Sequence, residues 1–162
     1  MSSRWRAVLG IGVSIGILLG TGILSASAQA ADPRIGTWKL NVAKSKYSPG
    51  PAPQSQTLKI EAVGKGEKVT SEVVNTDGTK ATTQYTANFD GEDYAVTGSP
   101  NWDAVTLRHI DRFTTEETDK KAGKVVQTAK VSLLRNGKTV IVSATAMDVR
   151  GQRVSENLIF EK

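Results

Sequence analysis

Short turns at a regular interval constrain this chain more than any other feature. In the C-terminal half, Gly123, Gly137 and Gly151 are each 14 residues apart, so every interval holds one long extended segment and one turn. Asp77-Gly78 and Asp90-Gly91 are dipeptides that readily adopt the positive φ values of a tight hairpin. Because a short turn forces each segment to pair with its neighbour in the chain, the pattern predicts an up-and-down antiparallel meander.

The segments between the turns predict strands. They are rich in Val, Thr, Ile and Ala, and some alternate clearly, as in Ala81, Thr83, Tyr85 and Ala87. No amphipathic helix is predicted after residue 35. The predicted strands are 36–41, 56–63, 67–75, 79–89, 92–97, 103–111, 112–119, 124–134, 138–149 and 152–161.

A meander of this length favours closure, because closure pairs the two edge strands that would otherwise promote aggregation. We therefore predict an all-β domain formed by a single antiparallel up-and-down β-barrel of about 8–10 strands. An open, flattened sandwich is the alternative fold.

Two segments interrupt the strand pattern. Tyr47–Pro53 contains three prolines, each of which lacks a backbone donor and restricts the residue before it. We predict that this segment is an extended connector between the first two strands. Gly98–Asn101 is a second, shorter break.

The first 31 residues differ in character from the rest. Arg4 and Arg6 precede an uncharged apolar stretch over residues 7–20, and Ala28-Gln29-Ala30 follows. This order predicts a secretory signal peptide with a helical apolar part and cleavage after Ala30, with Ala28 or Ala31 as alternative sites. An uncleaved anchor is the competing interpretation, because the stretch approaches the ~18 residues of a transmembrane helix. Four glycines in the stretch disfavour a long-lived helix.

Cleavage would release the predicted domain, residues 32–162, which are enough for one domain, into the periplasm or out of the cell. The chain has 21 Lys and Arg against 16 Asp and Glu, and loss of Arg4 and Arg6 lowers its formal charge from +5 to +3. That balance does not favour a nucleic-acid partner. The absence of cysteine excludes disulfides, thiolate metal sites and a cysteine nucleophile. No cofactor is predicted.

The first predicted strand resembles the opening of calycin barrels, the group of the lipocalins and the intracellular fatty-acid-binding proteins, through Gly36-Thr37-Trp38-Lys39-Leu40. The chain end, Leu158–Lys162, is similar to the closing strand of the fatty-acid-binding proteins. The resemblance implies a lipocalin-like barrel in which Gly36 and Trp38 are structural, with the indole plugging one end. The chain also resembles a group of exported bacterial proteins of uncharacterised activity, over Gly36–Asn41, Tyr47–Pro51, Asn88–Tyr94 and Gly98–Pro100.

The chain departs from the fatty-acid-binding proteins in two ways. Those proteins have a helical lid between strands one and two, where this chain has Tyr47–Pro53. Their closing strand presents an Arg and a Tyr to the ligand carboxylate, and the matching positions here are Leu158 and Phe160. The resemblance therefore implies an exported lipocalin-like barrel without this anion clamp.

Four residues are candidate ligand contacts. Trp102 follows the break between strands and would lie at a pocket rim, with an ordinary exposed loop indole as the alternative. Arg108 would bind an acidic head group if it pointed inward, or would be a surface cation. His109, the single histidine, and Tyr85, on an alternating strand, complete the set.

Neither catalysis nor metal binding is predicted. His109 and Asp111 share one strand face, but Ser99 has no nucleophile-elbow context and no oxyanion site can be identified. The acidic turn Asn88–Asp93 lacks the alternating oxygen ligands and the distal glutamate of a calcium loop. The charged segment 116–124 is interpreted as a solvated hairpin tip.

Small residues dominate the strand faces, and the chain contains few aromatic residues to fill a barrel: 3 Trp, 3 Tyr and 3 Phe. Such a lining leaves room for a modest ligand. We therefore predict an exported, non-enzymatic protein that binds a small, apolar molecule and keeps no stable membrane anchor after cleavage. The alternative is an envelope interaction or structural module with a filled barrel and contacts through loops 47–55 and 98–103.

Overall fold

The computed structural model describes residues 32–48, 50–147 and 151–162. These residues belong to one compact unit. The predicted signal peptide, residues 1–31, lies outside the described residues. Within the described ranges, no helix is long and apolar enough to cross a bilayer.

The described part of the chain is built almost entirely of strands. The ten predicted strands are present, and their described ends lie within two residues of the prediction; the predicted end of strand 138–149 is outside the described residues. The elements in chain order are β1 (Gly36–Leu40), the 3₁₀ turn η1 (Val42–Lys44), β2 (Lys46–Ser48), β3 (Ser55–Val63), β4 (Gly66–Val74), β5 (Lys80–Asn88), β6 (Tyr94–Thr97), β7 (Ala104–Asp111), β8 (Thr114–Lys121), β9 (Lys124–Leu133), β10 (Thr139–Met147) and β11 (Arg153–Glu161).

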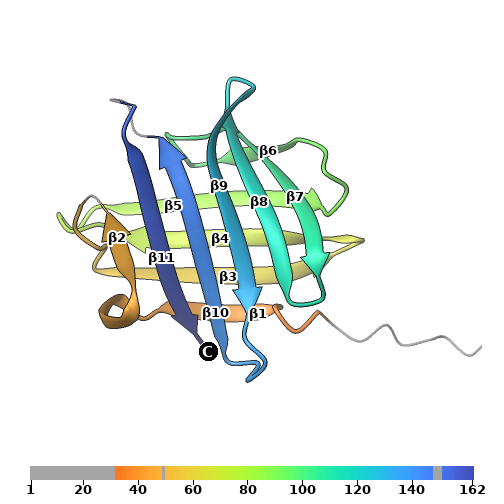
Figure 1. The fold of residues 1–162 in the computed structure, drawn as a ribbon, viewed down its shortest axis with the longest axis horizontal. Helices are drawn as coiled ribbons and strands as arrows, with labels where there is room; N and C mark the ends of the chain where they lie inside the picture. Colours follow the sequence, from red (N-terminus) through yellow and green to blue (C-terminus); the bar gives the residue numbers. More distant parts are fainter. Residues whose placement is uncertain (1–31, 49, 148–150) are drawn as a thin grey trace, which may run out of the picture. The chain divides into compact units, whose positions relative to one another are not determined.

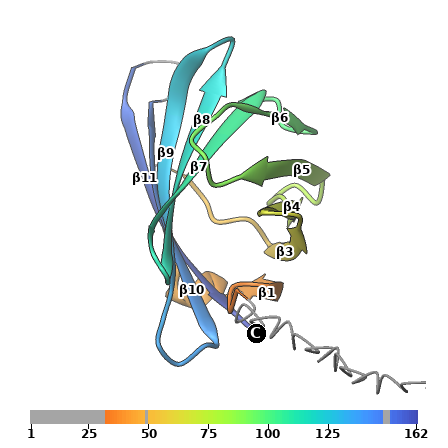
Figure 2. The same cartoon turned by 90° about the vertical axis from the view of Figure 1, so that its right-hand side faces the viewer.

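The strands form a closed antiparallel barrel. From β3 to β11 each strand pairs with the next in the chain, and β1 pairs with β3. β11 also pairs with β1 through Lys39↔Glu161 and Leu40↔Phe160, which closes a barrel of ten strands among the described residues. In Figure 1 the strands β7 to β11 cross in front of β3 to β5, and Figure 2 shows the two groups as separate layers. The predicted closed barrel is confirmed, and the open sandwich is wrong.

The strand β2 was not predicted. After β1, the Asn41 side chain accepts a hydrogen bond from the backbone N–H of Lys44 at 3.1 Å and caps the turn η1. The chain then returns to β11 through Lys46–Ser48, with Tyr47 opposite Glu156. The prediction that Tyr47 and Ser48 belong to the connector is therefore wrong. β1 pairs with β11 only at Phe160 and Glu161, and β2 pairs with Ser155–Asn157 earlier in β11, where the backbone groups would otherwise lack partners.

One end of the barrel is filled by a hydrophobic core around Trp38. The indole is 0% exposed and donates its N–H to the carbonyl oxygen of Arg34 at 2.8 Å. The Lys162 ammonium lies 4.4 Å from the indole ring centroid. Gly36 has a φ of 141°, and a Cβ there would lie 3.0 Å from the Lys162 side chain. The buried members of this core are Trp38, Ile60, Val69, Val131, Leu133, Val140, Leu158 and Phe160.

Candidate functional site

A cavity of about 1010 Å³ lies inside the barrel. Its walls come from inward-facing positions of β3 to β5 and β8 to β11, together with Tyr47 of β2. At one end it is bordered by connector residues, including Pro51, Pro53, Pro100 and Trp102, and at the other it meets Phe160 of the core. The connector end is therefore the mouth, and the Trp38 end is the base.

Small residues keep this interior hollow. Strand register places Glu117, Ala129, Ala144 and Glu156 side by side on β8, β9, β10 and β11. Glu117, Ala144 and Glu156 line the cavity, and Ala129 is buried. Two alanines between two long acidic side chains leave space against the wall, since neither methyl group reaches far into the barrel. The wall thus combines a shallow apolar surface with carboxyl groups on both sides.

Two carboxyl groups on β8 lie close together: Glu117 lines the cavity, and Asp119 is buried beside it. Tyr85 donates its hydroxyl to Glu117 Oε2 at 3.1 Å. Asp119 is 0% exposed, and its Oδ2 accepts a hydrogen bond from Gln127 Nε2 at 2.9 Å. Its other oxygen, Oδ1, has no hydrogen-bond partner among the described residues. Asp119 is two residues from Glu117, so the two share one face of the strand.

Burial raises the pKa of Glu117, and the neighbouring Asp119 charge adds to this rise. Burial also raises the pKa of Asp119, although its bond to Gln127 acts in the opposite direction. The pair therefore retains a proton at pH values where exposed carboxyl groups are ionised. Tyr85 has a pKa raised well above its usual value by burial and by the charge of Glu117, so it remains a hydrogen-bond donor.

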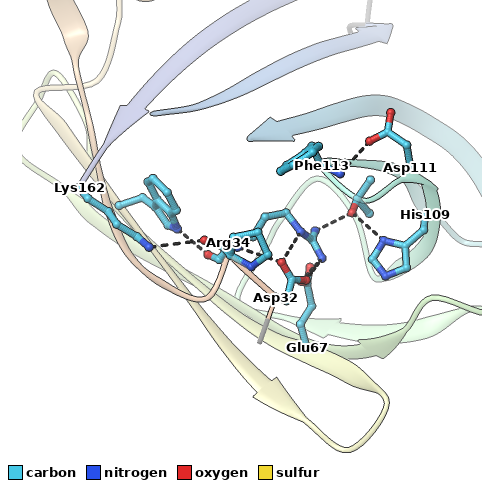
Figure 3. A network of polar contacts seen from close by, with 10 residues as sticks. Asp32, Arg34, Glu67, His109, Asp111, Phe113 and Lys162 are labelled. Carbon is cyan, nitrogen blue, oxygen red and sulfur yellow. Dashed lines mark hydrogen bonds and ion pairs between the residues drawn. The ribbon is translucent and has the colours of Figure 1, made fainter. Parts of the chain in front are cut away.

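A second polar group lies near the base and is shown in Figure 3. Arg34 is 1% exposed, and its guanidinium donates to Asp32 Oδ1 and Oδ2 at 3.2 and 2.5 Å and to Thr115 Oγ1 at 2.6 Å. Its Nη2 also lies 3.2 Å from Glu67 Oε2. That glutamate oxygen nevertheless accepts no hydrogen bond from the described part of the chain.

The two carboxyl groups beside Arg34 respond differently to it. Burial alone would raise the pKa of Asp32, but the hydrogen bonds and charge of Arg34 outweigh it and lower that pKa. For Glu67, burial outweighs the Arg34 charge and raises the pKa to about 7. The Arg34 guanidinium already forms a bidentate hydrogen bond with Asp32. This explains why Arg34 does not keep Glu67 ionised although it lies close by.

The third polar group is at the seam between β2 and β11. Tyr47 and Glu156 are directly opposite each other and both line the cavity. Burial, with the Glu156 charge, raises the pKa of Tyr47 to about 12, and burial raises that of Glu156. The Tyr47 hydroxyl is buried without a hydrogen-bond partner in the described ranges. It is therefore free to bond a polar atom inside the barrel.

The structure brings two of the four candidate contacts to the cavity. Tyr85 and Trp102 line it, Tyr85 from β5 and Trp102 from the loop at the mouth. Arg108 and His109 are not among the lining residues. Arg108 is exposed and lies against the turn at Gly91, where a Cβ would be 2.6 Å from its Nε. Ligand contact by any of the four remains a prediction.

His109 lies near Arg34, outside the cavity lining. Its ring stacks on Phe89 with centroids 3.8 Å apart, and its Nδ1 is 3.5 Å from Thr115 Oγ1. The pKa of His109 is lowered mainly by burial and to a smaller extent by the charge of Arg34. Asp111, which the sequence placed on the same face, accepts instead from the backbone N–H of Phe113 at 2.7 Å. The geometry is that of a packed surface histidine.

The interior carboxyl groups were missed by sequence reasoning. The interpretation of segment 116–124 as a solvated tip is wrong for Glu117, which lines the cavity, and for Asp119, which is buried, whereas Glu116 is exposed. Alternation along β8 contained the signal, because Thr115, Glu117 and Asp119 share a face, and Thr115 is 1% exposed. Within the described ranges, no three His, Asp or Glu side chains are arranged to hold a metal ion.

No protein-family model and no curated protein matches the sequence. Among solved structures, the chain is similar to the zebrafish ileal bile acid-binding protein in complex with cholic acid. The TM-score is 0.52 at 11% identity, and the match covers 80% of this chain and 98% of that chain.

The siderocalin Ex-FABP, described as functioning through dual ligand specificities, matches over 80% of this chain and 73% of its own, at 14% identity. Its TM-score is 0.34. Strand order, barrel closure and the similarity to the bile acid-binding protein lead to one conclusion: the described domain shares its fold, a closed antiparallel up-and-down β-barrel, with that bile acid-binding protein.

Proposed function

We propose that this chain is an exported, non-enzymatic protein that holds a small, mainly apolar molecule inside its barrel. The cavity of about 1010 Å³ supports the proposal most directly. Its volume is close to the upper end of the usual range of small-molecule sites, roughly 300–1000 Å³. Val69, Val131 and Leu158 contribute apolar surface to its lining, and its few polar groups would fix the orientation of a ligand.

The alternative of a filled barrel is not favoured. That hypothesis requires side chains packed solidly through the interior, whereas the lining leaves a continuous cavity from the mouth to the core. The loops predicted to bind a partner protein instead border the cavity, through Pro51, Pro53 and Trp102. Their position suits the control of ligand entry.

The surroundings of His109 do not favour a catalytic role. A general base needs a positioned partner and a reacting atom within hydrogen-bond reach. His109 is stacked on Phe89, and the side chain of Asp111 is bonded to the Phe113 backbone. Neither side chain lines the cavity.

The binding proposal is tested by titrating the purified protein with dodecanol and recording tryptophan fluorescence. Trp102 lines the mouth, so we expect a saturable change that is lost in Trp102→Phe. Ala144→Phe places a ring in the cavity and should abolish binding, whereas Ser143→Phe, on the exposed side of the same strand, should not. Unaltered fluorescence in the wild-type protein, together with no ligand in native mass spectra of protein from its host, would refute the proposal.

Export is tested separately by the intact mass of the protein from its host. The mature chain is expected to begin at Ala31, or within a few residues of it, and to appear outside the cytoplasm. A full-length chain that begins at Met1 would contradict cleavage.

A further inference from the structure

We propose that the molecule held in the barrel carries a protonated amine, and that Glu117 and Asp119 bind this cation. The inference rests on the binding function proposed above and assigns the chemical class of the ligand. Three observations support it: the ionisable groups that line the cavity are mainly acidic, the buried Oδ1 of Asp119 has no hydrogen-bond partner among the described residues, and Tyr85 and Gln127 hold the two carboxyl groups in place.

The ionisable groups below the mouth are predominantly acidic. Glu67, Glu117 and Glu156 line the cavity, and the lining contains one cationic side chain, Lys121, among the described residues. Lys121 is 46% exposed at the rim and lies 3.8 Å from Asp103. An anionic head group would therefore enter between carboxyl groups without an interior cation to bind, whereas an ammonium would compensate them.

Arg34, the buried cation near the base, does not change this balance. Its guanidinium is already bonded to both oxygens of Asp32 and to Thr115. It also lies 3.2 Å from Glu67. One positive charge therefore faces two carboxyl groups there, and none remains for a ligand carboxylate.

An unpaired acceptor marks where the cation would bind. Asp119 is 0% exposed, and its Oδ1 has no hydrogen-bond partner among the described residues. Buried polar groups in proteins are normally hydrogen-bonded, so an N–H donor at this oxygen would complete its bonding. Glu117 and Gln127, its neighbours on β8 and β9, both line the cavity. Asp119 is not itself among the lining residues, but it is close enough to Glu117 for the two carboxyl groups to share a proton. An ammonium that binds Glu117 from the cavity would replace that proton and so bond both groups.

The pair is also held in position. Tyr85 donates to Glu117 at 3.1 Å, and Gln127 donates to Asp119 at 2.9 Å. Each carboxyl group thus has one oxygen fixed by a neutral donor, and the two groups are close enough to share a proton with each other. Charge-assisted hydrogen bonds from an ammonium are stronger than neutral ones, particularly in a poorly hydrated interior. The apolar body of the ligand would lie against Val131 and Leu158.

Three probes with the same hydrocarbon tail separate the possibilities: dodecylamine, dodecanol and dodecanoate. Each is titrated into the full-length or natively processed protein near pH 7, below its micelle concentration, by calorimetry. We expect the amine to bind at least about tenfold more tightly than the alcohol, and the carboxylate most weakly. Glu117→Gln combined with Asp119→Asn should reduce amine affinity to that of the alcohol and leave alcohol affinity within about twofold. Glu116→Gln, on the exposed side of the same strand, is the matched control and should change neither.

The outcomes distinguish this inference from the function on which it rests. If the alcohol binds and the amine binds no more tightly, or the carboxylate binds best, the cation site is wrong while the binding function stands. If none of the probes binds, the binding function itself fails. If the double variant does not fold, the same titrations are made with Glu117→Gln alone. This variant keeps an acceptor for the Tyr85 hydroxyl and loses only the charge of Glu117. An unchanged preference for the amine in that variant would overturn the assignment.

Discussion

The stability of the barrel should fall as the pH rises from about 5 to about 7, because it buries carboxyl groups that are not fully paired. Glu67 is the best defined of them. Burial raises its pKa from 4.5 to about 7 in the folded protein, despite the Arg34 charge. Between these two values the folded state holds a proton that the unfolded chain has released. Stability is therefore greatest below the unfolded pKa and is lost as the pH approaches the folded pKa.

The size of the effect follows from linkage. One additional proton held by the folded state gives a slope of up to about 1.4 kcal/mol per pH unit. For Glu67 alone, the shift from 4.5 to about 7 lowers the free energy of unfolding by about 2 kcal/mol between pH 5 and 7. Glu117 and Asp119, whose pKa values are also raised, add to the fall. His109, whose pKa is lowered, acts in the opposite direction.

Urea unfolding of the purified protein, followed by tryptophan fluorescence at intervals from about pH 5 to about pH 8, measures the dependence. Glu67→Gln cannot ionise and should flatten the curve by about 2 kcal/mol over the same range. Glu72→Gln, an exposed position on the same strand, should leave the curve unchanged. A wild-type stability that is constant or rises between pH 5 and 7 would mean that these carboxyl groups are ionised in the folded state, and the reasoning would fail.

Two further predictions concern the framework of the barrel. Trp38→Phe removes a fully buried indole and leaves the Arg34 carbonyl without its 2.8 Å donor. The free energy of unfolding measured in urea should therefore fall by about 2 kcal/mol or more. A fall of less than about 0.5 kcal/mol would contradict the role of Trp38 as the plug of the barrel base. Gly66→Ala would place a Cβ 2.0 Å from the carbonyl oxygen of Ala87 and force β4 from β5. It should cost more than Gly123→Ala, where φ is 76° but the space is open; equal unfolding midpoints for the two variants would show that steric contact is not the limiting factor.

The strands and their order could be predicted because both signals are local. Gly123 and Gly137 bracket β9, and alternation within such a segment fixes its period. β2 carries no comparable signal. Its three residues, Lys46–Ser48, are a strand only because β11 lies beside them, and β11 is at the far end of the sequence.

The interior carboxyl groups could not be predicted for a different reason. Alternation placed Glu117 and Asp119 on one face of β8, but charged side chains are usually on the solvent side. The partners of Glu117 decide the direction: Leu107 on β7 and Ala129 on β9, both buried, flank it in the sheet. That information lies in the register between strands, which the sequence of a single strand does not contain. Tyr85, by contrast, was selected from alternation and lines the cavity.

The seam between the first and last strands determines when the domain can finish folding. β1 and β2 both pair with β11, whose last residue is Glu161, so the barrel cannot close until almost the entire chain is available. Contacts between residues so distant in sequence form slowly, because the chain loses much conformational entropy before it gains them. Under the proposed export, the segment already delivered would stay open until the C-terminal strand arrives.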